Sequence, residues 1–561
     1  MLYRVLFTTL LLSLISTAYS ADPTTDIAEE YLEREKLIKE LEKLYAEQQK
    51  EKAKQENIQK RVEEIIPVED QCFEIMSVRL TGNTSLDYDD LNKIIKPYKN
   101  RCLGKGGVNQ LMEKLTATYI DNGYITSRVY IPPQDLSKGI LELIVVEGIV
   151  EGLAINDNDA EDRRKLWWAM PEQMGEHLTL QKIEQGIDQL NSVQSANATM
   201  KLWPGNVPGG SFITIINEPD DEFRGRLTLN NEGQDSTGRR KLTFGLEGDN
   251  LLDVNDAWGL TYIGSKDTNA ISFNVGVPYR YWNFSLSHSY SEYLNILPGN
   301  TDLFGQSNTS TLSSQYLVWR TGKLKLKWNN NLTVRRSQRS ILGEKLTPQK
   351  QVPIRTAINL SENRQWGFYS LEVGLTQGTK LLAASKRPSS ANRYSPKAEF
   401  LKTDGRFTLV SPISRIMSYQ TSLAWQYTGD VLYSSEQMHA GDKNTVRGFR
   451  NSVLSGEKGV NWRNDFNFLM PSIYQHVLSG VSPAWTRHVS FYSFIDFAMI
   501  QAQYQQHSQR AFGFGSGFRV NLVHSKYRNT SMDFGWSKGV ELHRNVNDSY
   551  AIYASITTKL F

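Results

Sequence analysis

The sequence predicts a membrane all-β protein: an antiparallel transmembrane β-barrel of about 16 strands, preceded by two small α/β domains and an N-terminal helix. The first observation is a change of pattern at Phe223, after which apolar and polar residues alternate, as around Leu242, Phe244 and Leu246. Alternation suits strands with lipid on one face and a polar lumen on the other. The second is length, because residues 223–561 hold about 16 strands of roughly ten residues with their connections. A soluble β-sandwich also alternates, but rarely for so long with so many aromatic residues.

Residues 1–20 have the features of a secretory signal. Arg4 supplies the positive start, Val5–Ile15 the apolar run, and Ala18-Tyr19-Ser20 the small-x-small pattern of a cleavage site before Ala21. The apolar run is too short to span a bilayer, which takes roughly 20 helical residues. We therefore expect an exported chain, with a retained anchor as the alternative.

Residues 21–66 predict a charged helix with a single apolar stripe, followed by a linker. The stripe residues recur at steps of three or four, which places them on one helix face: Ile27, Tyr31, Ile38, Leu41 and Tyr45. One interpretation is a helix that plugs a wet cavity. The other is a short coiled coil or a solvated spacer, and the residues alone favour neither.

Two α/β units of the same order follow, at residues 67–148 and 149–220. The first has helical patterns at Asp87–Ile95 and Val108–Asp121, the latter ending at Asn122-Gly123 as a helix C-terminus should. Strand patterns precede and follow these helices. The second repeats the order around a helical pattern at Leu180–Leu190. Tandem copies of one fold predict a short repeat array.

The chain has two cysteines, Cys72 and Cys102, both in the first α/β unit. In the oxidising compartment that an export signal implies, we expect a disulfide bond between them. In the chain-entropy model a bridge closing about 30 residues stabilises the fold by roughly 3–4 kcal/mol. Two unpaired thiols are the alternative.

The candidate site joins a charged loop to a strand with one carboxylate. The loop carries Thr445-Val446-Arg447-Gly448-Phe449, and Asp496 interrupts the apolar run Phe491–Ile500. Alternation places Asp496 on the lumen face, beside the next strand's inward glycines, Gly513, Gly515 and Gly517, which leave room for backbone to approach. We expect Arg447 and Asp496 to form a charge-assisted, bidentate pair. The alternative is that water solvates each charge separately.

The composition gives no support for an enzyme or for nucleic-acid binding. The net charge is only +3, and the eight histidines include no HExxH spacing. Gly104-Lys105-Gly106-Gly107 is not a phosphate loop, and Gly513–Gly517 lacks the serine spacing of a hydrolase elbow. We expect no catalytic site, no metal and no cofactor.

Several motifs in this order resemble the two-partner secretion transporters. Tyr119–Thr126 with Val146-Glu147-Gly148 is similar to the first polypeptide-transport-associated (POTRA) domain of that family, and Ile183-Glu184-Gln185-Gly186 to the second. Val446-Arg447-Gly448-Phe449 resembles the signature of the sixth extracellular loop, and Phe494-Ile495-Asp496-Phe497 the strand motif that receives its arginine. The sequence departs from the pattern at Ala498 and Lys559.

The resemblance implies a monomeric barrel in the lipid of the outer membrane, with its N-terminal domains in the periplasm. It also implies export of one large secreted partner protein: a contact-dependent growth-inhibition toxin, a haemolysin or an adhesin. A barrel-assembly insertase is the alternative, since such proteins share the Arg-Gly-Phe loop but resemble chains with more periplasmic repeats. A simple diffusion porin is a third class, in which periplasmic domains would have no purpose.

Overall fold

The computed structural model describes most of the chain beyond residue 65: residues 66, 67, 69–156, 160–172, 174–235, 238–297, 301–386, 392–414, 417–450, 453–469, 488–523, 529–542 and 548–561. The predicted export signal and the predicted N-terminal helix lie outside these described residues. Among the described helices, none is long and apolar enough to cross a membrane.

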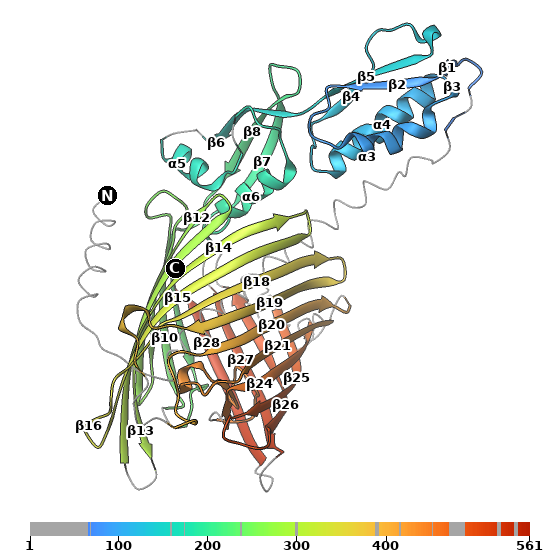
Figure 1. Cartoon of the computed structure of the whole chain (residues 1–561). Helices are drawn as coiled ribbons and strands as arrows, with labels where there is room; N and C mark the ends of the chain where they lie inside the picture. The colour runs from blue at the N-terminus through green and yellow to red at the C-terminus, as the bar shows by residue number, and fades with distance from the viewer. Residues whose placement is uncertain are drawn as a thin grey trace, which may run out of the picture.

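The first α/β unit packs two helices against a three-stranded sheet of order β2-β5-β4 (Figure 1). Asp87 caps α3 by accepting a hydrogen bond from the backbone N–H of Asp89, as an N-cap aspartate should. Buried Leu91, Leu111 and Leu143 belong to one core between helices and sheet. The elements are β1 Phe73–Ile75, β2 Ser77–Thr81, α3 Tyr88–Ile95, β3 Arg101–Leu103, α4 Lys105–Asp121, β4 Arg128–Tyr130 and β5 Ile140–Val146.

A disulfide bond joins Cys72 and Cys102, whose Cα atoms are 5.2 Å apart, so the predicted bridge is confirmed. Cys72 directly precedes β1, and Cys102 lies in β3, which pairs with β1. The bond therefore fastens the start of the domain to the segment between its two helices.

The second α/β unit has a sheet of order β6-β8-β7 and its own buried core, which includes Ile183 and Ile213. Its helix α5 has no counterpart in the sequence analysis, because AEDRRKLWWA shows no clear apolar stripe. The elements are β6 Ile149–Ile155, α5 Ala160–Ala169, α6 Leu180–Leu190, β7 Ala198–Pro204 and β8 Gly210–Asn217.

The rest of the described chain forms a closed antiparallel barrel, so the predicted fold class is confirmed. Five register pairs between β28 and β9, from Ser555↔Asn230 to Lys559↔Arg226, close it. Two short pieces, β16 Glu344–Lys345 and β17 Gln349–Gln351, extend the wall beside β15. The 16 spanning strands are β9 Phe223–Asn230, β10 Lys241–Asp249, β11 Ala257–Gly264, β12 Thr268–Tyr279, β13 Trp282–Leu297, β14 Thr301–Arg320, β15 Leu324–Ile341, β18 Pro353–Arg364, β19 Gly367–Gly378, β20 Leu401–Pro412, β21 Met417–Thr428, β24 Lys458–Leu469, β25 His488–Gln501, β26 Gln509–Val523, β27 Asn529–Glu541 and β28 Asp548–Lys559.

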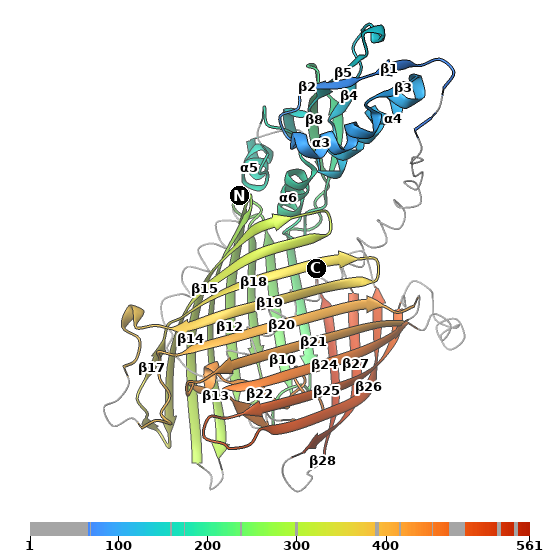
Figure 2. The same ribbon diagram turned by 45° about the vertical axis from the view of Figure 1, so that its right-hand side comes forward.

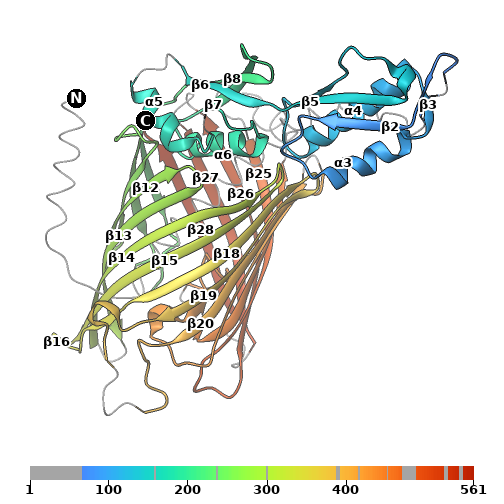
Figure 3. The same cartoon turned by 45° about the horizontal axis from the view of Figure 1, so that its top comes forward.

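The second α/β unit docks on the turns at one barrel end, where Figure 3 shows α5 and α6 beside the strand ends. In the turn between β12 and β13, the backbone N–H of Arg280 donates to the carbonyl of Trp168 at 2.8 Å, and the Gln189 side chain donates to the carbonyl of Arg280. At the next turn on this side, between β14 and β15, the guanidinium of Arg320, the last residue of β14, lies 2.6 Å from Asp188 and 3.1 Å from Glu184. Neutral and ionic contacts thus fix this domain over the barrel.

One buried carboxyl lies close to this junction. Glu172 is 4% exposed and accepts one hydrogen bond, from the backbone N–H of Thr179 at 3.3 Å. Burial raises the pKa of the Glu172 carboxyl to about 7, and the positive charge of Lys182 opposes this shift only in part. The second α/β domain therefore contains a group that titrates near neutrality.

Candidate functional site

A long loop, residues 429–457, connects β21 to β24 and folds back into the barrel. It contains a 3-10 turn η4 at Ser434–Glu436 and two short strands, β22 Met438–Ala440 and β23 Leu454–Gly456, which pair with each other. Figure 2 shows β22 within the outline of the barrel, at the end away from the α/β domains. Apolar residues of the loop, including Val446 and Phe449, form a small core with Ala498 and Ala511 of the wall.

Arg447 at the loop tip meets Asp496 on β25. The two side chains are 3% and 0% exposed. Arg447 Nε donates to Asp496 Oδ2 at 2.6 Å and Nη2 donates to Oδ1 at 2.7 Å. The backbone N–H of Arg447 also donates to Oδ2, at 3.1 Å. Both carboxylate oxygens are therefore occupied, in the bidentate geometry that suits guanidinium.

The same guanidinium contacts a second carboxylate that the sequence analysis does not single out. Arg447 Nη1 donates to Asp465 Oδ1 on β24 at 2.6 Å. The guanidinium carbon lies 3.6 Å from the ring centroid of Phe494, a cation–π distance. One cation thus bridges two neighbouring strands, which a lysine with a single nitrogen cannot do in the same geometry.

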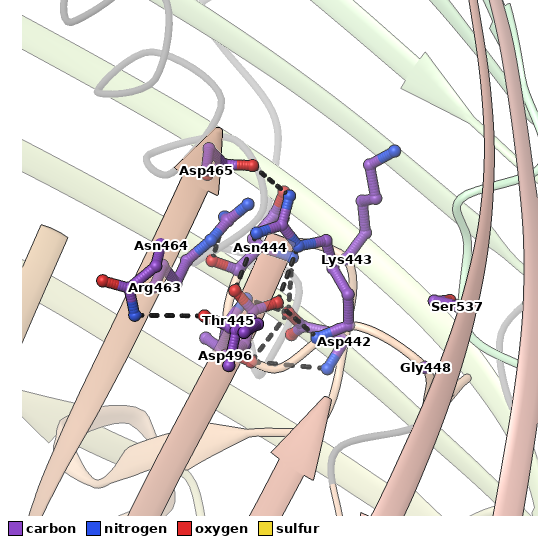
Figure 4. A network of polar contacts seen from close by, with 12 residues as sticks. Asp442, Lys443, Asn444, Thr445, Gly448, Arg463, Asn464, Asp465, Asp496 and Ser537 are labelled. Carbon is purple, nitrogen blue, oxygen red and sulfur yellow. Dashed lines mark hydrogen bonds and ion pairs between the residues drawn. The ribbon is translucent and has the colours of Figure 1, made fainter. Parts of the chain in front are cut away.

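The residues before the arginine form a tight turn that presents it (Figure 4). Asp442 Oδ1 accepts hydrogen bonds from the backbone N–H groups of Asn444 and Thr445, and Thr445 Oγ1 accepts from the N–H of Gly441. Lys443 in this turn is 3.2 Å from Glu232. These contacts hold the turn independently of those that Arg447 makes.

The motif residues after the arginine fit against β27 and β28. Gly448 has φ +109°, and a Cβ there would lie 2.3 Å from the backbone nitrogen of Gly539, so only glycine fits. Tyr553 Oη donates to the carbonyl of Phe449 at 3.0 Å. Phe449 is 3% exposed, and its ring occupies the space that a side chain at Gly539 would take.

The three wall glycines do not all serve the loop, which differs from the expectation. At Gly513 a Cβ would lie 2.1 Å from the carbonyl oxygen of Arg447, so the loop backbone does approach this position. At Gly515 and Gly517 the nearby side chains are the rings of Phe494 and Tyr492, on the neighbouring strand. These two glycines make room for aromatic packing in the wall.

The other end of the loop has its own ionic anchor, which sequence reasoning missed. Glu436 in η4 lies 2.8 Å from Arg335 on β15 and 2.9 Å from Lys402 on β20. Glu436 is 7% exposed. No local motif marks these residues, although alternation along β15 and β20 would have placed both cations on the lumen face. The loop is therefore attached to four strands of the wall, to β15 and β20 through Glu436 and to β24 and β25 through Arg447.

Within the described part of the chain, no group of three or more His, Cys, Asp or Glu side chains is placed to hold a metal ion. The arrangement positions a loop by charge, and its carboxylates are already occupied by cations of the protein.

Three family models match the chain. The family described as haemolysin secretion/activation protein ShlB/FhaC/HecB matches residues 209–520. A ShlB-type POTRA domain matches residues 73–148, and a second POTRA domain matches residues 149–204. The outer membrane transporter CdiB of Dickeya dadantii (strain 3937) is 31% identical over 83% of this chain and 83% of its own.

The chain belongs to the ShlB/FhaC/HecB family. It is an outer-membrane transporter of the two-partner secretion type, with its POTRA domains in the periplasm. The haemolysin transporter protein HpmB of Proteus mirabilis is 26% identical over 86% of this chain and 85% of its own. The solved structure of CdiB from Escherichia coli, 23% identical, has the same fold, with a TM-score of 0.81 over 97% of this chain and 100% of that one. The insertase alternative fits this family less well.

Proposed function

We propose that this ShlB/FhaC/HecB-family protein captures one large, unfolded secreted partner in the periplasm and moves it outward through the barrel. The partner would be a contact-dependent growth-inhibition toxin, a haemolysin or an adhesin. The names of the relatives support the first two of these partners, since they include CdiB and haemolysin transporters. The protein would act as a monomer in lipid, without catalysis or cofactor.

The observation that carries the proposal is the buried attachment of loop 429–457 to the barrel wall, which we call the loop seat: Arg447 with Asp496 and Asp465. A loop held inside a conduit by a buried guanidinium and two carboxylates is a device for controlling passage. The POTRA domains lie at the opposite end from the loop and would present the partner, by adding its strand to a sheet edge. We assign residues 1–20 to the export signal, 21–66 to a plug helix and linker, 67–148 and 149–220 to the POTRA domains, and 221–561 to the barrel.

A secretion assay tests the role of the loop. Arg447→Ala and Asp496→Ala should each reduce export of the partner while leaving the heat-modifiable mobility of the folded barrel intact. Lys266→Ala, on an exposed turn of another loop, is the matched control. If both single variants secrete the partner at the wild-type level, the Arg447–Asp496 pair has no role in secretion.

The N-terminal stripe of Ile27, Tyr31, Ile38, Leu41 and Tyr45 would close the resting pore. A helix of about 20 residues is roughly 30 Å long, which matches a bilayer core. Deleting residues 24–45 should raise ion conductance in planar bilayers and sensitise cells to bulky antibiotics. Unchanged conductance would leave only the spacer interpretation.

A further inference from the structure

The outward face of β13–β15 and β18 shows where this wall leaves the membrane. On this face the register aligns Trp282, Tyr316 and Trp328 in one cross-strand row near the periplasmic end. The rings of Trp282 and Tyr316 are 4.6 Å apart, as in the aromatic girdle of membrane barrels. Further along, Leu286, Leu312, Leu332 and Ile354 form an apolar row. The first row therefore marks the inner boundary of the lipid-facing band.

A third row on the same face is polar and basic. The register places Tyr290 opposite Asn308, Asn308 opposite Arg336, and Arg336 opposite Lys350 of β17. The neighbouring residue Arg335 points inward to Glu436, and successive side chains of a strand point to opposite faces. Arg336 is accordingly exposed on the outside of the barrel.

The spacing puts this row at the outer membrane boundary. Eight residues separate Trp328 from Arg336, about 26 Å of strand at roughly 3.3 Å per residue. With the usual barrel tilt this is about 20 Å of height, against an apolar band about 25 Å tall. The long side chains of Arg336 and Lys350 extend from there to the head groups of the outer leaflet.

Two cations directly opposite each other on neighbouring strands repel and destabilise the pair. Neither Arg336 nor Lys350 forms an ion pair with a carboxylate in the described part of the chain. Lys350 Nζ donates to the carbonyl of Leu382, which uses one of its three protons. The acidic residue on the adjacent outward row, Glu292, accepts hydrogen bonds from Tyr290 and Asn269 instead. The arrangement is therefore complementary to an anion that the described residues do not supply.

Exposed leucines lie beside these charges. Leu381 and Leu382, in the 3-10 turn η3 Leu381–Ala383, are 52% and 59% exposed. Leu382 has φ +50°, a left-handed conformation that is costly for leucine. The contact from Lys350 and the hydrogen bond from the Ser385 N–H to the Lys350 carbonyl, at 2.8 Å, hold the turn next to β17. Apolar side chains next to an unmatched pair of cations suit a ligand with an anionic head and acyl chains.

We propose that Arg336 and Lys350, with the η3 leucines, form a binding site for a phosphate-bearing lipid of the outer leaflet. The two cations take the head-group phosphate, and Leu381 and Leu382 contact the acyl region. This site lies on the outside of the barrel wall whose inner face carries the Glu436 anchor of the loop. The proposal goes beyond the transport role and is independent of the identity of the cargo.

The test is native mass spectrometry of the full chain, delipidated in detergent and then mixed with lipid A. Wild-type protein should carry lipid A adducts, and Arg336→Gln/Lys350→Gln should lower the bound fraction by about tenfold or more. Lys266→Gln/Arg240→Gln removes two exposed extracellular cations, after β11 and before β10, and should bind like wild type. Heat-modifiable mobility checks that each barrel is folded, and Arg336→Gln alone replaces the double variant if that does not assemble.

Two further arms separate the sources of phosphate. Phosphatidylethanolamine, whose phosphate is neutralised by its own amine, should bind more weakly than lipid A. Inorganic phosphate at the same concentration should not displace lipid A. Equal lipid A binding by wild type and the Arg336 variants overturns the site, and displacement by inorganic phosphate overturns its assignment to a lipid.

Discussion

The loop seat and the POTRA domains are stabilised in opposite ways. The first POTRA domain has a continuous apolar core, in which Leu91, Leu111 and Leu115 are completely buried, and a disulfide bond beside it. The loop has a small core of few apolar side chains, and its strongest contacts are ion pairs at Arg447 and Glu436. The apolar core distributes its stabilisation over many side chains. Each ionic attachment of the loop instead depends on a single residue, Arg447 or Glu436.

This difference has a functional consequence. A buried ion pair is costly when one partner is removed, but the net gain from forming the intact pair is small, because taking both charges out of water offsets most of their attraction. We therefore expect a loop held in this way to be released when water or a passing chain supplies alternative partners for its charges. A domain held by its apolar core has no such alternative and remains folded while it works.

The largest effect is expected at Arg447. Arg447→Ala leaves Asp496 and Asp465 without their cation, and breaking such a buried pair costs about 3–5 kcal/mol. We expect protease added to intact cells to cleave within residues 429–457 in the variant and not in wild type. The swap Arg447→Asp/Asp496→Arg should not restore protection, because residue 447 would then face Asp465. Equal protection in Arg447→Ala and wild type would contradict the anchor.

The next effect separates the two regions. Replacing Cys72 and Cys102 by serine should destabilise the first POTRA domain by about 3–4 kcal/mol through lost loop-closure entropy. Protease resistance of that domain in graded urea should fall to the level that dithiothreitol produces in wild type. The loop should stay protected, and loss of loop protection would show that the regions are coupled.

A pH-dependent effect is expected at Glu172. Burial raises its pKa from the ordinary 4.5 to about 7, so the folded domain binds the proton more tightly than the unfolded chain. This contribution to stability is fully present below about pH 4.5 and is lost as the pH rises through about 7. Glu172→Gln should therefore stabilise the second POTRA domain at pH 8, by about 1–3 kcal/mol, and much less at pH 5. Resistance to proteolysis in urea at both pH values measures it, and a pH-independent difference would contradict it.

The smallest effect is expected at the junction of the second POTRA domain with the barrel. Arg320→Gln removes charge-assisted bonds to Glu184 and Asp188, while Lys325 keeps its own contact with Asp188 at 2.5 Å. We expect a loss of about 1–2 kcal/mol, seen as wider distance distributions between spin labels on α6 and on the turn. Lys323→Gln, exposed in the same turn, should change nothing. Unaltered distributions in Arg320→Gln would place the junction's strength in the backbone contacts around Arg280.

Much of the fold could be read from local patterns. Alternation places Asp496 on the lumen face, because the side-chain period of a strand is fixed at two. The POTRA helices could be read from their apolar periodicity, apart from α5, whose composition lacks a stripe. The disulfide followed from having two cysteines in an exported chain.

The sequence by itself determined the strand alternation, the order of the domains and the charged loop motif, because each depends on neighbours along the chain. Only the tertiary structure decided that Asp465 shares the guanidinium of Arg447, that Glu436 binds Arg335 and Lys402, and that Arg336 faces Lys350. These contacts depend on how far each strand is shifted against the next and on the path of the loop through the lumen. Closure of the barrel fixes both, and that closure depends on all 16 strands together rather than on any one segment.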